Sequence, residues 1–97
     1  MSMIKHLVLA KFKPGVTKEQ VAEMKKMLAA LPAVIPEIKS YDFGQDIRPE
    51  KTFDFILVSE FTDMEAIGRY RIQPDHAAAA QYIRNLSEDM QIVDFEF

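Results

Sequence analysis

Two segments of the chain are apolar on both faces of an extended strand, and this feature constrains the fold more than any other. Residues 3–12 and 53–61 place apolar side chains at both even and odd positions. Alternate residues of a strand share one face, so such a pattern is typical of a strand covered on both sides. We expect the first segment to be at least partly buried on both faces and the second to be a central strand.

A helix is predicted to follow the first strand. Thr17 and, three residues on, Gln20 have the form of a capping box, in which each side chain satisfies a backbone N–H of the other. Apolar residues then recur at helical spacing as far as Leu31, and Pro32 and Pro36 break the pattern. This helix is amphipathic and should lie against a sheet.

Two further helices are predicted after the central strand. Thr62 and Glu65 indicate a second capping box, which should open a short helix through Tyr70. Pro74 interrupts that helix, and an alanine-rich helix is expected from about 75 to 86, because proline is pre-organised for a first helical position.

The remaining strands complete a familiar order of elements. Residues 38–45 and 90–97 alternate as strands, which gives the order βαββααβ in one domain spanning residues 1–97. This order predicts a ferredoxin-like α+β fold, an antiparallel sheet with helices on one face.

The face of the sheet without helices is predicted to be apolar. Its expected members are Leu7, Leu9, Ile56, Val58, Val93, Phe95 and Phe97. Soluble monomers seldom expose a contiguous apolar patch of this size. We therefore expect a homodimer in which two sheets pack face to face.

Composition excludes several classes of function. The net charge of −3 and the scattered lysines and arginines give no footprint for nucleic acid. The absence of cysteine excludes disulfides and thiolate sites, and two histidines are too few for a dedicated transition-metal site. The apolar stretch within residues 1–13 is too short and too charged for a membrane span. We expect a cytoplasmic protein with no metal, no cofactor and no membrane partner.

Five short segments together resemble a known family. They are residues 4–9 (IKHLVL), 11–13 (KFK), 35–36 (IP), 43–46 (FGQD) and 70–76 (YRIQPDH). Over essentially its full length the chain resembles the stress-responsive dimeric α/β-barrel domain family, called Dabb. The resemblance implies a ferredoxin-like fold that dimerises into an α/β barrel.

The resemblance also implies a site. A plant polyketide cyclase of this family closes a poly-β-ketone by aldol condensation, and its catalytic tyrosine and histidine match Tyr70 and His76, while a pocket histidine matches His6. Other pocket positions of that enzyme are occupied differently here, with Phe55 in place of a histidine and Ala79 in place of a phenylalanine. The residues expected to contact substrate are His6, Val8, Met24, Leu28, Leu57 and Ile92.

These residues allow two main interpretations; a third, a monooxygenase like those of the related antibiotic-biosynthesis barrel family, is disfavoured because the chain has no tryptophan and no equivalent polar triad. In the first, the chain is a small-molecule enzyme acting on an apolar or carbonyl-rich ligand: His76, in the first turn of its helix, stays neutral and acts as a base, and Tyr70 donates to a carbonyl oxygen. In the second, His76, Tyr70 and His6 are structural, and the protein is a non-catalytic, stress-associated oligomer or ligand-binding protein. A cavity with His76 and Tyr70 directed into it favours the first interpretation, and a filled core favours the second.

Overall fold

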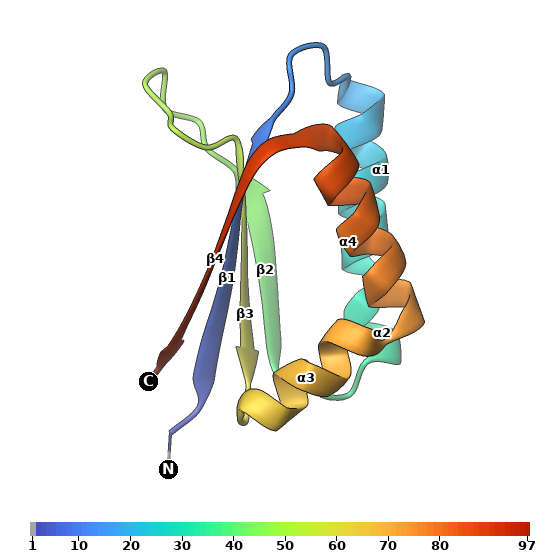
Figure 1. Ribbon diagram of the computed structural model, residues 1–97, viewed down its shortest axis with the longest axis vertical. Helices are drawn as coiled ribbons and strands as arrows, with labels where there is room; N and C mark the ends of the chain where they lie inside the picture. The colour runs from blue at the N-terminus through green and yellow to red at the C-terminus, as the bar shows by residue number, and fades with distance from the viewer. Residues whose placement is uncertain (1) are drawn as a thin grey trace.

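The computed structural model describes residues 2–97, which form one antiparallel sheet with helices along one face (Figure 1). The strands lie in the order β2-β3-β1-β4, so β3 is central as predicted, and β1, predicted to be buried on both faces, is central too. The ferredoxin-like α+β fold is confirmed. In chain order the elements are β1 (Ile4–Phe12), α1 (Lys18–Ala29), α2 (Leu31–Val34), β2 (Ser40–Gln45), β3 (Phe55–Phe61), α3 (Met64–Ile72), α4 (Pro74–Leu86) and β4 (Ser87–Glu96).

Several boundaries differ from those predicted. The first helix was predicted to continue to Leu31 and to end at Pro32, but it ends at Ala29. Pro32 lies in the first turn of a separate short helix, α2. Proline is tolerated there because the N–H groups of a first helical turn have no partner within the helix. Strands β2 and β3 begin later than predicted, and β4 begins earlier, at Ser87, directly after α4.

The cap of α3 is also corrected. The Thr17 and Gln20 capping box is present, with both reciprocal hydrogen bonds formed. At α3, however, the N-cap is Asp63 instead of Thr62, and its Oδ1 accepts the Ala66 N–H at 2.8 Å. The sequence offered two adjacent good caps, and a carboxylate also favours the positive end of the helix dipole.

We expect Asp63→Ala to destabilise the fold by about 1 kcal/mol, the usual cost of losing an N-cap. Helix α3 carries Tyr70, so the measurement bears on a residue of the predicted site. Urea denaturation followed by circular dichroism gives the free energy of unfolding. Thr62→Ala is the matched control and should change it little; a larger loss for Thr62→Ala would contradict the cap described here.

The two faces of the sheet differ in their environment. The inner face packs on the helices through a core that includes Val8, Leu57 and Phe61, each at most 8% exposed. On the outer face Leu7 and Val58 are half-buried, and Val93, Phe95 and Phe97 are 50%, 46% and 49% exposed.

None of the helices within residues 2–97 has the length and apolar character that a membrane-spanning helix needs.

Candidate functional site

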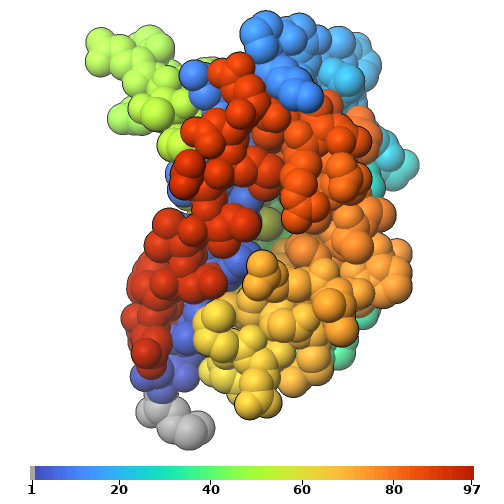
Figure 2. Space-filling model, viewed as in Figure 1, coloured from blue at the N-terminus to red at the C-terminus, as the bar shows by residue number. Residues whose placement is uncertain are grey.

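A cavity of about 70 Å³ lies between the sheet and the helices. Its walls come from β1, β3, β4, α1, α3 and α4. Figure 2 shows the molecule hollowed between red β4 and the orange and yellow helices α4 and α3, with blue β1 visible in the hollow. All predicted site residues except Met24, which is fully buried in the core, line this cavity: His6, Val8, Leu28, Leu57, Tyr70, His76 and Ile92.

His76 lies in the first turn of α4, where local hydrogen bonds fix it. The Gln73 side chain caps the helix and accepts the His76 backbone N–H at 2.9 Å. The ring Nδ1 lies 3.2 Å from the backbone oxygen of Arg71. A carbonyl oxygen only accepts, so Nδ1 carries the proton that makes this bond. In the neutral ring, Nε2 is then the nitrogen with a free lone pair, as a base requires.

The pKa of His76 is lowered, chiefly because burial penalises the charged ring. The hydrogen bond to the Arg71 carbonyl opposes this shift, and the charges of His6, Arg84 and Arg71 add to it. A lowered pKa was also predicted from the position of His76 at the start of a helix. The largest cause, however, is desolvation of the ring in the cavity.

An NMR titration should find the midpoint of His76 below the ordinary histidine value of about 6.5. Above about pH 6.5 His76 is neutral in the folded and the unfolded chain, and its contribution to stability is complete. As the pH falls from that value through the lower pKa of the folded state, the unfolded chain binds the proton more readily, so the free energy of unfolding decreases. Two-dimensional spectra of the imidazole carbons resolve the two histidines of the chain. A midpoint at or above 6.5 would contradict the burial described here.

Tyr70 contacts both His76 and a second tyrosine, Tyr41. Its ring lies 4.0 Å from the ring of His76, centroid to centroid, and 4.8 Å from that of Phe61. Its hydroxyl lies 2.7 Å from the hydroxyl of Tyr41 on β2. Burial raises the pKa of Tyr70 to about 12 and raises the pKa of Tyr41 further above its usual range. Both hydroxyls therefore stay protonated at neutral pH and can donate hydrogen bonds.

His6 pairs with a carboxylate across the sheet. Strands β1 and β4 place His6 directly opposite Asp94, and the His6 Nδ1 contacts Asp94 Oδ1. The His6 ring is buried beside Phe61 and Tyr70 in edge-to-face contacts. The hydrogen bond fixes the orientation of the His6 ring at the cavity wall.

Four residues of the site were not predicted from the sequence. They are Tyr41, Asp94 and the two arginines at the rim of the cavity, Arg71 and Arg84. Tyr41 shares the inner face of β2 with Phe43, and Asp94 shares its face of β4 with Ile92, so a polar residue among inward-facing apolar ones was the available signal. Arg71 and Arg84 line the cavity and are exposed. Residues 2–97 hold no group of three side chains suited to a metal ion.

This arrangement combines a neutral imidazole, a neutral phenol and two guanidinium groups around a small, mostly apolar space. An imidazole nitrogen of lowered pKa can accept a proton near neutral pH, and the phenol can donate to an oxygen that gains negative charge. The guanidinium groups can bind an anionic substituent. The set is suited to proton abstraction beside a carbonyl.

Comparisons with known proteins agree with this architecture. Olivetolic acid cyclase of Cannabis sativa is 30% identical over 95 residues, covering 95% of this chain and 94% of that protein. The stress-response A/B barrel domain-containing protein HS1 of Arabidopsis thaliana is 29% identical, covering 96% and 88%. A dimeric ferredoxin-like protein of unknown function from Thermobifida fusca superposes with a TM-score of 0.91 at 33% identity, covering 99% and 92%. The family described as Stress responsive A/B Barrel Domain matches residues 4–97, and the chain belongs to it.

Proposed function

We propose that this protein is an enzyme that removes a proton from the carbon beside a carbonyl group, with His76 as the base and Tyr70 as the hydrogen-bond donor. One observation carries the proposal: the His76 ring packs on Tyr70 at the cavity wall while its Nδ1 is engaged by the Arg71 carbonyl. The C–H bond breaks, its proton passes to Nε2, and its electron pair forms an enolate. The enolate oxygen accepts a hydrogen bond from Tyr70, and the enolate carbon then attacks a second carbonyl or regains a proton.

Tyr41 is the positioning residue in this scheme. A phenol has one proton to donate and lone pairs with which to accept. When Tyr41 donates across the 2.7 Å contact, the proton of Tyr70 is available for the substrate. Tyr41 thereby holds the Tyr70 oxygen in place and increases its acidity as a donor.

The size and charge of the cavity restrict the substrate. A volume of about 70 Å³ is far below the several hundred Å³ of a typical ligand pocket. We infer that only the reacting end of a substrate, a few heavy atoms, enters, and that the rest lies in the hollow beside β4. Arg71 and Arg84 favour a substrate with an anionic group. The 30% identity with olivetolic acid cyclase supports carbonyl chemistry. Phe55 and Ala79 occupy two positions that match pocket residues of the plant cyclase, but here both are buried and neither lines the cavity, which supports a different substrate.

The test follows exchange of the α-protons of acetylacetone and of acetoacetate in D₂O by proton NMR. Enolisation replaces these protons with deuterium without requiring a second substrate. We expect the wild-type protein to accelerate exchange over buffer, and more for acetoacetate, because its carboxylate can pair with the rim arginines. Exchange at the buffer rate for both compounds would contradict the proposal.

We also propose that the protein is a homodimer that packs its outer sheet faces together. The outer face leaves Val93, Phe95 and Phe97 about half exposed, next to the half-buried Leu7 and Val58 on the neighbouring strands. The Thermobifida fusca protein of the same fold is described as dimeric. Sheet-on-sheet packing would bury these side chains without altering the cavity on the inner face.

A second candidate function is that of a non-catalytic, stress-associated oligomer or ligand-binding protein. The small volume of the cavity favours it, since the core around Met24, Leu28 and Phe55 is almost completely filled. In that case His76→Ala and Tyr70→Phe would alter thermal stability, and acetylacetone exchange would stay at the buffer rate.

A further inference from the structure

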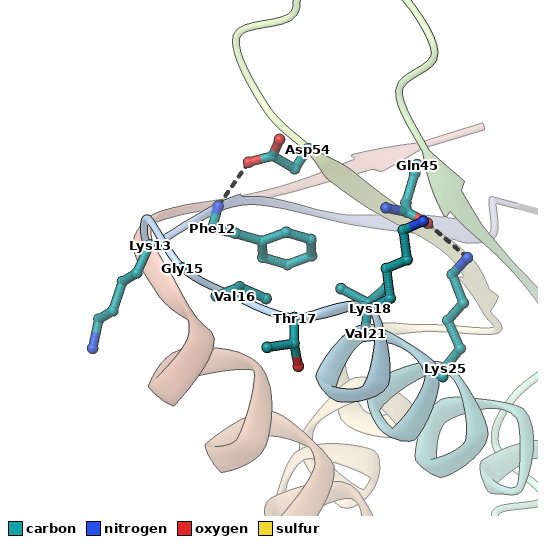
Figure 3. A pocket seen from close by; sticks show the side chains of 11 residues that line it. Phe12, Lys13, Gly15, Val16, Thr17, Lys18, Val21, Lys25, Gln45 and Asp54 are labelled. Atoms are coloured by element: carbon teal, nitrogen blue, oxygen red, sulfur yellow. Dashed lines mark hydrogen bonds between the residues drawn. The ribbon is translucent and has the colours of Figure 1, made fainter.

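A second concavity, of about 440 Å³, lies at the end of the sheet where β1 leads into α1. It shares no lining residue with the cavity of His6, Tyr70 and His76. Its apolar wall consists of Phe12, Val16 and Val21, which are all partly exposed. Figure 3 shows the Phe12 ring directed into this space between the β1–α1 loop and the ends of β2 and β3.

The wall is held in a defined shape by its neighbours. The Phe12 ring stacks on Phe55, with centroids 6.4 Å apart and an interplanar angle of 29°. The Phe12 backbone N–H donates to Asp54 Oδ2 at 2.8 Å, which joins the end of β1 to the start of β3. Gly15 turns the loop at a φ of +86°, a conformation that favours glycine. The pocket is therefore formed before any ligand arrives.

The charge around this pocket is positive although the chain as a whole is acidic, at −3. Lys18 and Lys25 extend from α1 toward the strand end that carries Gln45, while Lys13 extends away (Figure 3). Lys25 Nζ donates to the neutral Gln45 Oε1 at 2.8 Å. Among residues 2–97, neither Lys18 nor Lys25 has a carboxylate within ion-pair distance.

The single acidic residue that lines the pocket is already engaged. Asp54 accepts the Phe12 N–H through one oxygen, and its other oxygen lies 3.6 Å from Lys51 Nζ. The capping box of Thr17 and Gln20 likewise satisfies the helix start. Within residues 2–97 these two ammonium groups next to an apolar wall thus have no anionic partner, and lysines without one attract an anion from solution.

We propose that this pocket binds a small amphiphilic carboxylate, such as a medium-chain fatty acid or an arylalkanoic acid. The carboxylate pairs with Lys18 and Lys25 and accepts a hydrogen bond from the amide of Gln45. The apolar body lies on Phe12, Val16 and Val21. A volume of about 440 Å³ falls within the range of small-molecule sites, which combine an apolar lining with a few polar groups. This site is independent of the enolisation proposed above.

The test titrates the full chain with octanoate and records ¹H–¹⁵N correlation spectra. We expect the largest shifts at the backbone amides of 12–25, Gln45 and Asp54, with little change at His6, Tyr70 and His76. The double variant K18Q/K25Q should weaken binding about tenfold, because each exposed charge contact is worth a few-fold in affinity. Binding should also weaken with added salt.

Lys26→Gln is the matched control, because Lys26 is adjacent on α1 but does not line the pocket. It should leave octanoate affinity unchanged; an equal loss would show non-specific attraction and overturn the proposal. Octanamide, the neutral analogue, should bind about as weakly to the wild type as octanoate does to the double variant. If inorganic phosphate binds as tightly as octanoate, the apolar wall contributes nothing to affinity and the proposal fails. If the largest octanoate-induced shifts lie on the outer face of the sheet, the ligand binds elsewhere and the proposal is wrong.

Discussion

Replacing His76 with alanine should lower the rate of α-proton exchange by about 10²- to 10⁴-fold, the usual contribution of a positioned general base. The substitution removes a cavity-lining imidazole whose pKa is lowered by burial and whose Nε2 has a free lone pair. The backbone N–H at position 76 keeps its hydrogen bond to the Gln73 side chain in the variant, and the ring that is removed is only partly buried, so the fold should change little. The measurement is the exchange rate of acetoacetate in D₂O per mole of protein.

Two tyrosine variants show whether His76 acts with the donor described here. Tyr70→Phe should reduce exchange by removing the hydroxyl that stabilises the enolate, whereas Tyr41→Phe should reduce it less, because Tyr70 keeps its proton. The pH profile separates a base from a structural role: the wild-type rate should hold below pH 6.5 and fall only at the lowered pKa of His76. Loss of thermal stability in His76→Ala with no loss of exchange would favour the non-catalytic oligomer.

The fold could be predicted because its signals are local or periodic. Strands β1 and β3 carry apolar residues on both faces, and that pattern predicted burial on both sides for β1 and a central position for β3. The wrong predictions arose where the same residues are compatible with two local structures. Thr62 and Asp63 both suit an N-cap, and Pro32 suits the first turn of a new helix as well as the end of an old one.

The site was harder to predict because its partnerships depend on strand register and helix docking. His6 and Asp94 are 88 positions apart and meet only because β1 and β4 pair in one register. Tyr41 reaches Tyr70 only when α3 docks across β2 and β3. The resemblance to the Dabb family supplied Tyr70 and His76 but not these two partners, and it placed Met24 at the cavity although the residue points into the filled core.

Val58→Asp should convert the protein from dimer to monomer at micromolar concentration. Val58 lies on central strand β3, opposite Leu7 on β1 and Asp42 on β2, so its side chain is near the middle of the outer face. An unpaired charge buried there costs on the order of 3 to 5 kcal/mol, which weakens the dimer at least about a hundredfold. Sedimentation velocity gives the mass of the species present.

Ile47→Asp is the matched control for this substitution. Ile47 lies in the loop between β2 and β3 and is 96% exposed, so the same charge at that position stays in water. The Ile47 variant should sediment as the wild type does. Because Val58 faces away from the cavity, a Val58→Asp monomer that remains folded should keep the His76–Tyr70 contact on the inner face. A wild-type protein that sediments as a monomer at micromolar concentration would contradict the proposed interface and leave the apolar outer face to another occupant.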